Sequence, residues 1–407
     1  MNPTQGPTGP THWPAVLAAT LAGVAIAVNV GKVPLAIAGL RGELGLSLVQ
    51  AGWVSSLLTT LAVLVALAAG LAVGRLGALR MVVGGLAASA LGSALALAAD
   101  GFATLVATRL LESAGFLAVA VAAPSLISAA AAPTDRRFAL GIWSAYLPAG
   151  AGLAMALSPL LLPAAGWRGL WLLAAALLLA AAAGVLAQRR HFAAAAPSGH
   201  ALPWAGALTV LRQPLPWLYG LAFGLWALQH YALIVWMPSF LREQRGLDAA
   251  AAAWLTCLML LACVPGNLLG GALVQRGLSR GRLIAISQLA TGLLGLGCAS
   301  EALPDGARYA CSVALSFIGG VVPAAALSAS AVLARSAQQI GAVQGAVMQC
   351  SQLGQFIGTP LIAAVVAASG QWSSARWVTA GAAALAVALG LWAERAERSA
   401  RAGQRRL

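Results

Sequence analysis

Four ionisable side chains lie inside long apolar stretches of this sequence, namely Lys32, Arg109, Glu112 and His230. An ionisable group surrounded by hydrocarbon is costly, and one that is retained there marks a functional site by default. Lysine and arginine attract anions, whereas glutamate and histidine can take up and release a proton. These residue types therefore indicate binding of a small anionic or polar solute, with proton transfer as a second chemistry.

Lys32 is the only lysine in the chain, because every other basic residue is an arginine. It can serve as a point charge for an anionic solute, or it can change its protonation state when it loses water. The alternative is a structural role, in which the long side chain reaches the headgroup layer and binds nothing. A depth of roughly 8 Å below the end of its helix, at about 1.5 Å per residue, is compatible with both roles.

Arg109 and Glu112 are three residues apart, a spacing that places both side chains on one face of a helix. The sequence leaves three interpretations open: a structural ion pair, Arg109 as a ligand for an anion, or Glu112 as the proton carrier. His230 binds the solute, takes up a proton, or is a hydrogen-bonded histidine of the core. Its neighbours Gln229 and Tyr231 suit a polar lining.

The composition of the chain predicts that these groups are held by membrane helices. Of the 407 residues, 60% are hydrophobic and only 8% are charged, and the mean hydropathy is +0.87. A soluble domain carries roughly 25% charged residues, so the solvent of this protein is predicted to be lipid. Helices that cross a bilayer need about 20 apolar residues. Twelve such segments are predicted, at 13–37, 47–73, 79–99, 102–128, 138–163, 168–187, 215–240, 248–273, 282–300, 307–332, 341–368 and 374–393.

An internal repeat divides these twelve segments into two sets of six. Residues 40–53 recur as residues 241–254 at a constant offset of 201, and Ser47 and Asp248 are both predicted helix N-caps. The same offset relates Asn29 to His230. Transporters built from such repeats place the solute between symmetry-matched polar groups, so Asn29 joins the candidate binding residues.

The order of segments predicts five parts of the chain. They are a disordered N-terminus (1–12), a six-helix bundle (13–187), a linker (188–214), a second six-helix bundle (215–394) and a basic tail (395–407). Most arginines fall between helices on the side that also carries both termini. By the positive-inside rule, both termini are predicted to be cytoplasmic, in a multi-pass protein of the inner (plasma) membrane.

Two motifs resemble those of a known family. Residues 70–80 read Gly-Leu-Ala-Val-Gly-Arg-Leu-Gly-Ala-Leu-Arg and resemble the loop signature Gly-x-Leu-Ala-Asp-Arg-x-Gly-Arg-Arg of the major facilitator superfamily. Residues 109–115 are similar to the Arg-x-x-Gln-Gly-x-Gly pattern of the same superfamily. Gly74 departs from the signature, because the family usually has an acidic residue there. Within the superfamily, the segment from Asn29 to Pro34 most resembles the cyanate/nitroimidazole permease branch.

This resemblance implies an all-α polytopic membrane protein with twelve transmembrane helices in two pseudo-symmetric six-helix bundles. The family's central cavity is lined by the helices expected here at 13–37, 102–128, 215–240 and 307–332. The resemblance also implies a cytoplasmic gate, to which Arg75, Arg80 and Arg276 would contribute.

The expected function is that of a secondary active transporter for a small anionic or polar solute, working by alternating access, with proton symport left open. The candidate residues are Lys32, Arg109, His230, Asn29, Gln229 and Tyr146 for solute binding, and Glu112 and His230 for proton coupling. The alternative is an exporter of lipophilic compounds that uses Trp143, Trp226 and an apolar cavity wall. The order of proline and glycines in residues 146–152 differs from the exporter pattern Gly-Pro-x-x-Gly-Gly, which disfavours that alternative.

Other classes of function lack sequence support. The five cysteines lie inside apolar segments without metal-ligand spacing, so neither disulfides nor a metal site is predicted. No nucleophile elbow, phosphate-binding loop or zinc-protease motif is present, and we expect neither an enzyme nor a cofactor. The formal charge of +14 is spread over loops, which argues against nucleic-acid binding. The expected partners are a small-molecule solute and the lipid bilayer, and the protein is expected to be a monomer.

Overall fold

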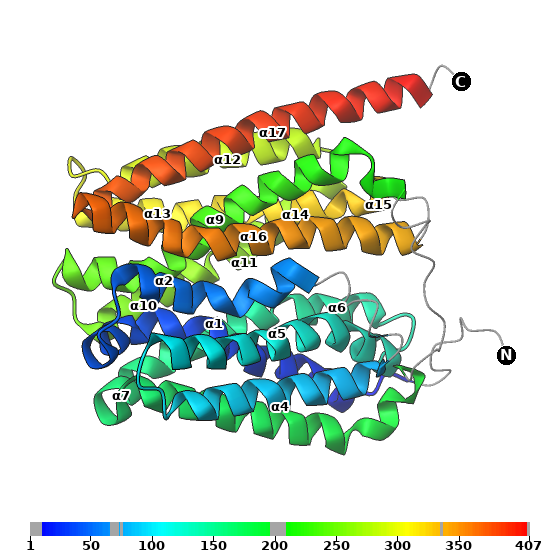
Figure 1. Cartoon of the computed structure of the whole chain (residues 1–407). Coiled ribbons are helices and arrows are strands. Elements are labelled where there is room, and N and C mark those ends of the chain that lie inside the picture. The colour runs from blue at the N-terminus through cyan, green and yellow to red at the C-terminus, as the bar shows by residue number, and fades with distance from the viewer. Residues whose placement is uncertain (1–9, 66–72, 74–75, 196–208, 334–336, 405–407) are drawn as a thin grey trace. The chain divides into compact units, whose positions relative to one another are not determined.

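The computed structural model describes residues 10–65, 73, 76–195, 209–333 and 337–404 (Figure 1). Within these ranges the chain is helical and contains no strand. The described residues form two compact units, one within 1–201 together with 246–254, and the other within 202–245 and 255–407. We call the described residues up to 195 the N-terminal half and those from 209 onwards the C-terminal half. The predicted disorder of the N-terminus falls mainly on residues 1–9, which lie outside the described ranges.

The N-terminal half consists of long helices that lie side by side (Figure 1). α1 packs along α7 and α5, and α4 packs between α5 and α7. A short 3-10 helix, η2 (Arg189–Ala195), follows α7. The helices of this half are α1 (Trp13–Leu44), α2 (Leu48–Ser56) continued by η1 (Leu57–Thr59), α4 (Ala78–Ala96), α5 (Phe102–Ala130), α6 (Arg136–Ser144) and α7 (Tyr146–Ala187).

In the C-terminal half, α9 packs against α16 and α17, and α12 packs against α17 and α13. Two of its membrane spans are interrupted, one between α10 and α11 and the other between α13 and α14. The helices are α9 (Pro214–Glu243), α10 (Ala249–Leu261), α11 (Cys263–Gln275), α12 (Arg280–Cys298), α13 (Asp305–Gly319), α14 (Val321–Ser328), α15 (Ser330–Leu333), α16 (Ala337–Ser369), η3 (Trp372–Ser374) and α17 (Ala375–Gln404).

Eleven helices in the described residues are long and apolar enough to cross a membrane. One of them, α7, has 42 residues and non-helical dihedral angles at Gly166. At about 1.5 Å per residue it is roughly twice as long as the hydrocarbon core is thick. α7 therefore supplies most of two predicted spans, 138–163 and 168–187, and the structure agrees with the twelve-helix prediction.

The predicted N-caps are confirmed in both copies of the repeat. The Ser47 hydroxyl accepts a hydrogen bond from the Gln50 amide, and the Gln50 side chain accepts one from the Ser47 amide. The Asp248 carboxylate accepts one from the Ala251 amide at 2.8 Å. Each cap satisfies backbone donors that a helix start leaves without an intrahelical partner.

The turns repeat as well as the caps. The described glycines with positive φ form three pairs, Gly45 with Gly246, Gly77 with Gly277, and Gly166 with Gly370. Their φ angles agree to within ten degrees in each pair, from 60° to 85° across the set. A side chain rarely adopts such angles, so glycine is needed where each helix turns back. The two halves therefore share their backbone turns as well as their sequence motif.

Two helices end later than the sequence predicted. α1 continues to Leu44 instead of residue 37, because the chain offers no break until Gly45 adopts the left-handed conformation. α17 continues to Gln404, whereas the sequence predicted a separate tail from residue 395. Glu394 and Glu397 on α17 pair with arginines of α12, which holds this end of the helix to its neighbour. The boundary predicted at residue 394 is therefore not a structural break.

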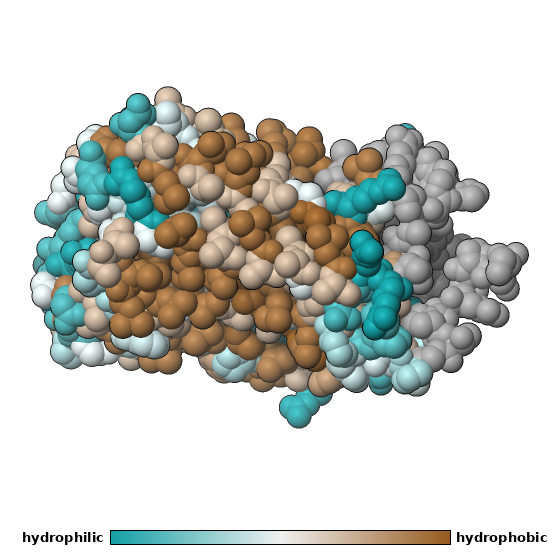
Figure 2. All heavy atoms as spheres, turned by 90° about the horizontal axis from the view of Figure 1, so that it is seen from below, coloured by the Kyte–Doolittle hydropathy of each residue, from teal (hydrophilic) through white to brown (hydrophobic). Residues whose placement is uncertain are grey.

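The outer surfaces of the helices are apolar along their middle. Figure 2 shows hydrophobic side chains across the centre of one face and hydrophilic ones towards its ends. Large side chains on α4 and α7 are more than half exposed, including Leu91, Leu95, Leu172 and Leu179. Such a surface is stable in lipid, where only the backbone must be satisfied internally.

Candidate functional site

The N-terminal half encloses a cluster of charged side chains that are completely buried. The ammonium of Lys32 lies 2.7 Å from Oε1 of Glu112 and donates to Oδ1 of Asn29 at 2.6 Å. It also donates to the hydroxyl of Ser93 at 2.9 Å. Each of these four side chains has no exposed surface. Lys32 is therefore part of a buried polar network.

Arg109 completes the network from the other side of the carboxylate. One of its terminal nitrogens pairs with Oε2 of Glu112. Its Nε donates to the backbone oxygen of Val54 at 3.0 Å, and its terminal nitrogens donate to the backbone oxygen of Asn29 at 3.3 and 3.4 Å. Glu112 thus binds a different cation through each oxygen. We call Asn29, Lys32, Ser93, Arg109 and Glu112 the charge cluster.

Several helices meet at the charge cluster. Asn29 and Lys32 come from α1, Ser93 from α4, and Arg109 and Glu112 from α5. The Lys32 ammonium also lies 4.4 Å from the ring centroid of Trp171 on α7, a cation–π contact. Contacts with residues on α1, α4, α5 and α7 hold the ammonium inside the N-terminal half. The alternative in which the Lys32 side chain reaches the headgroup layer and binds nothing is wrong in this structure.

The charge cluster has an excess positive charge. Lys32 and Arg109 are cations and Glu112 is the one carboxylate among the five side chains, which leaves a net charge of one. A buried ion pair is tolerated only when its members are well hydrogen-bonded, and an excess charge raises the cost further. The side-chain nitrogen of Asn29 is buried and has no hydrogen-bond partner. The cluster therefore presents both an uncompensated charge and an unused donor, which an anion would satisfy together.

A glycine on α4 allows Glu112 to reach its partners. A Cβ atom added to Gly92 would lie 2.8 Å from the backbone oxygen of Thr108 and 2.9 Å from Cγ of Glu112. α4 and α5 therefore approach more closely here than any side chain larger than hydrogen permits. The contact also places Ser93, the next residue, against Glu112, where its hydroxyl donates at 2.7 Å.

We expect the Gly92→Ala variant to be less stable by about 1–3 kcal/mol, because the added methyl group must push α5 away from α4. The matched control is Gly84→Ala on the same helix, since no heavy atom lies within 4 Å of its added Cβ. Thermal unfolding of the two purified variants measures the difference. Equal melting temperatures for both variants would show that the close approach of α4 and α5 is not needed.

His230 has the surroundings of a core histidine. Its Nε2 lies 2.7 Å from the Ser316 hydroxyl on α13, and its ring stacks on Trp226 at a centroid distance of 4.4 Å. It is 9% exposed. The neutral, hydrogen-bonded interpretation is the one that this geometry supports. Asn29, its partner by sequence offset, instead belongs to an ionised network.

Gln229 also lies among neutral groups. Its side-chain nitrogen donates to the backbone of Leu225 at 3.2 Å and to Oε1 of Gln288 at 3.3 Å. The Thr291 hydroxyl donates to the same oxygen of Gln288 at 3.1 Å. In the described part of the C-terminal half, the polar contacts around α9 at this depth are thus uncharged. The charge chemistry found around α1 has no counterpart there.

The other predicted site residues lie apart from the charge cluster. Tyr146 stacks on Trp143 with 4.2 Å between ring centroids. Arg80 at the start of α4 and Arg276 at the end of α11 are exposed. Arg75 lies outside the described residues.

Ser93 and Trp171 were not predicted. A serine and a tryptophan in apolar helices carry no distinctive signal, although the Gly92-Ser93 pair marks a point of close helix packing.

The comparisons with known proteins agree with this architecture. A family model described as Major Facilitator Superfamily matches residues 16–359 and, in a second match, residues 241–407. The chain belongs to the major facilitator superfamily. The second match lies within the C-terminal half. This major facilitator is a multi-pass membrane transporter and not an enzyme.

Solved structures with the same fold include two of a bacterial homologue of the human lysosomal transporter Spinster. The structure in an inward-facing and occupied conformation is 15% identical, with a TM-score of 0.80 over 96% of this chain and 98% of that chain. The structure in an inward-facing and unoccupied conformation is 16% identical, with a TM-score of 0.75 over 95% and 98%. No curated protein sequence matches the chain at a significant level.

Proposed function

We propose that this major facilitator carries a small anion together with a proton, and that the charge cluster couples the two. The observation that supports this proposal is the fully buried arrangement of two cations around the one carboxylate of the cluster. The solute-binding residues are Lys32, Arg109 and Asn29, and the proton-coupling residue is Glu112. The protein is proposed to work as a monomer in the inner membrane, with both termini in the cytoplasm.

The coupling follows from the competition for the two cations. An anion that enters the cluster accepts hydrogen bonds from Lys32 and from the free side-chain nitrogen of Asn29, and it displaces Glu112. A buried carboxylate that loses its cations is stable only in the protonated form. Anion entry therefore brings a proton onto Glu112. The net charge of the cluster remains plus one before and after loading, so neither state buries a larger charge than the other.

Access to the cluster requires a second arrangement of the helices, because its side chains have no exposed surface in this one. We propose that the protein alternates between states that open the cluster to either side of the membrane. The inward-facing occupied and unoccupied forms of the Spinster homologue are consistent with such a cycle in this fold. Arg75, Arg80 and Arg276 are the proposed gating residues, on the basis of their motif positions.

An exporter of lipophilic compounds has less support. That alternative relies on Trp143 and Trp226 as cavity walls, but both are buried within their own halves. Trp143 stacks on Tyr146, and Trp226 stacks on His230 and contacts the backbone of Gly319 closely enough to exclude a methyl group there.

Uptake into proteoliposomes tests the proposed function. The purified protein is reconstituted with a more acidic outside, and uptake of nitrate, cyanate, pyruvate and phosphate is compared with that of organic cations. We expect saturable uptake of at least one of these anions, driven by the pH gradient and collapsed by a protonophore. Uptake of cations alone, or anion uptake unaffected by the pH gradient, would contradict the proposal.

The two candidate proton carriers can be separated with a variant of His230. We expect His230→Gln to retain at least about half of the anion uptake and the same dependence of rate on pH, because an amide can preserve the hydrogen bond to Ser316 and no ionised side chain contacts the ring in the described structure. The pH profile of initial uptake rates is the measurement. A profile that flattens in this variant would make His230 the proton carrier in place of Glu112.

A further inference from the structure

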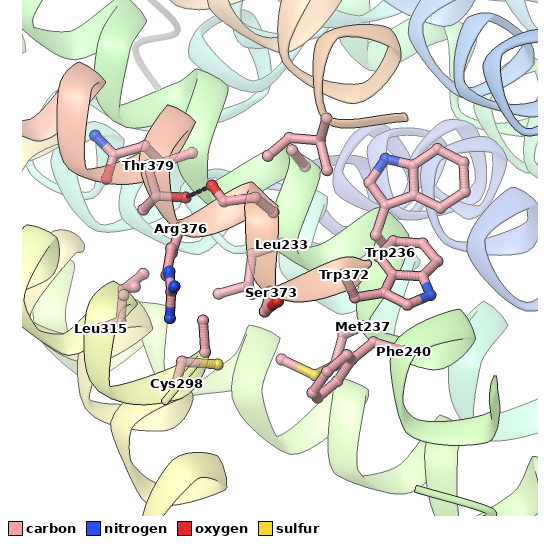
Figure 3. Close-up of a pocket in the computed structure, with 16 residues that line it drawn as sticks. Leu233, Trp236, Met237, Phe240, Cys298, Leu315, Trp372, Ser373, Arg376 and Thr379 are labelled. Atoms are coloured by element: carbon pink, nitrogen blue, oxygen red, sulfur yellow. Dashed lines mark hydrogen bonds between the residues drawn. The ribbon is translucent and has the colours of Figure 1, made fainter. Parts of the chain in front are cut away.

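The C-terminal half contains a cavity that the charge cluster does not explain. It lies between α9, α12 and the start of α17, with single contributions from α13 and α16, and its volume is about 90 Å³ (Figure 3). The walls are mainly apolar and aromatic, formed by Leu233, Trp236, Met237, Phe240, Leu315 and Trp372. A dry apolar cavity of about 150 Å³ binds benzene, so a single ring fits this smaller space only when the side chains around it move apart.

Two of the residues that line the cavity, Gln229 and Arg376, each carry a buried polar atom that has no hydrogen-bond partner. Oε1 of Gln229 is a buried acceptor, on a side chain that is only 3% exposed. Nε of Arg376 is a buried donor. Figure 3 shows the Arg376 guanidinium directed towards the space beside Cys298 and Leu315. Leaving such atoms unsatisfied costs about 1–3 kcal/mol each, so a ligand that satisfies both would gain affinity.

The equivalent place in the N-terminal half is built differently. There the Trp167 indole donates to Glu43 at 3.0 Å, and the adjacent Arg168 pairs with the same carboxylate and donates to the backbone oxygen of Leu97 at 3.1 Å. In the C-terminal half the indole contact recurs, from Trp372 to Glu243 at 3.1 Å.

The residue after Trp372, however, is the short Ser373. No side chain at that position bridges towards α12 as Arg168 bridges towards the end of α4. The nearest arginine, Arg376, stands one turn further along α17 and lines the cavity instead.

We propose that this cavity is a binding site for a small aromatic monocarboxylate with a hydroxyl group on its ring. The carboxylate pairs with Arg376, because a guanidinium can bind a carboxylate through two parallel hydrogen bonds. The ring packs against Trp236 and Leu315, and the thioether of Met237 gains a favourable contact with the ring. The hydroxyl donates to Oε1 of Gln229. This site is independent of the proposed proton coupling, because none of its residues belongs to the charge cluster.

The test uses the full-length protein in lipid nanodiscs and three probes that differ by one group each. 4-Hydroxyphenylacetate has both polar groups, phenylacetate lacks the hydroxyl, and phenylacetamide lacks the charge. We expect the increase in melting temperature to fall in that order, because at equal concentration a ligand that binds more tightly stabilises the folded state more. Arg376→Gln should remove the advantage of the acid over the amide, whereas Arg242→Gln, an exposed arginine of α9 that does not line the cavity, should keep it.

Alkylation of Cys298 reports on the same site directly, since this thiol lines the cavity. In a variant with the other four cysteines replaced by alanine, 4-hydroxyphenylacetate should slow maleimide labelling of Cys298 at least threefold, and it should still do so after Lys32→Met. Equal stabilisation by acid and amide, or labelling that the probe does not slow, would overturn the proposal. Protection that is lost with Lys32→Met would place the probe in the charge cluster and also overturn it.

Discussion

Replacing Glu112 by glutamine is expected to cause the largest loss of stability of any single substitution considered for this protein, about 3–5 kcal/mol. The carboxylate contacts Lys32 through one oxygen and Arg109 through the other, and all three side chains are completely buried. Glutamine keeps the size and some hydrogen bonds but removes the negative charge. Two buried cations then repel one another with no carboxylate between them. Thermal unfolding and yield of folded protein are the measurements.

A second substitution distinguishes this electrostatic cause from a packing defect. Adding Lys32→Met to Glu112→Gln removes one of the two unpaired cations, so the double variant should be more stable than Glu112→Gln alone. Independent packing defects would instead add and make the double variant less stable. If the double variant melts below Glu112→Gln, repulsion between the cations is not what destabilises the single variant.

The matched control is the exposed carboxylate Glu43. It pairs with Arg168, but the two side chains are 48% and 41% exposed. Exposed pairs contribute about 0–1 kcal/mol, because water and ions screen them. Glu43→Gln should therefore melt close to the unmodified protein. If Glu43→Gln lowered the melting temperature as much as Glu112→Gln, burial of the charge cluster would not explain the loss of stability in Glu112→Gln.

Replacing Lys32 by methionine is expected to reduce anion uptake at least about 100-fold while leaving the protein folded. The remaining Arg109–Glu112 pair is neutral. The substitution therefore removes the excess positive charge of the cluster and keeps the carboxylate that balances Arg109. Stability should change by about 1–3 kcal/mol, less than for Glu112→Gln, because the variant loses the ion pair with Glu112 and the hydrogen bonds to Asn29 and Ser93, while Arg109 still balances the carboxylate. Without the ammonium, however, Glu112 neutralises the remaining cation, Arg109, and no uncompensated charge draws an anion from bulk water into the site. Initial uptake rates in proteoliposomes measure the effect.

Two variants make the uptake result interpretable. Arg168→Gln removes a cation that lies outside the cluster and should leave uptake within about twofold, because its partner is exposed. Lys32→Arg keeps the charge but changes its shape, and we expect it to recover part of the uptake. Undiminished transport by folded Lys32→Met would remove this lysine from the mechanism.

The sequence predicts the helices of this protein well because lipid imposes a simple rule. A span must be apolar and long enough to cross the bilayer. The N-caps Ser47 and Asp248 then set where two helices start, and the left-handed Gly45 sets where α1 ends. The pairing of Arg109 with Glu112 is also predictable from sequence, because side chains three residues apart on one helix are neighbours. These are local relations that need no knowledge of helix packing.

The contacts between helices could not be predicted in this way. Lys32 and Glu112 are 80 residues apart, and they meet only because α1 and α5 are rotated so that both side chains face inward. In membrane helices the buried and lipid-exposed faces are both apolar, so hydropathy does not reveal that rotation. Gly92 brings α4 close to α5 beside Glu112, and this single glycine is not distinguishable in sequence from the many others.

The late end of α17 has a similar origin. Residues 395–407 are rich in arginine and the sequence predicts a separate tail there. In the structure Glu394 and Glu397 pair with arginines on α12, and the helix continues. From the sequence, His230 and Glu112 are equally suited to proton transfer. The hydrogen bond between His230 and Ser316, 86 residues away, favours a neutral core histidine. In each case a partner distant in the chain decides the role.

Infrared difference spectroscopy on anion binding tests the charge cluster most directly. The anion that gives the largest thermal shift is added to the protein in lipid, and the carbonyl stretching region of protonated carboxyl groups is recorded. The proposed mechanism predicts a new protonated-carboxyl band in the unmodified protein and its absence in the Lys32→Met/Glu112→Gln variant. A spectrum without such a band at saturating anion, or the same band in the double variant, would show that Glu112 does not take up the proton.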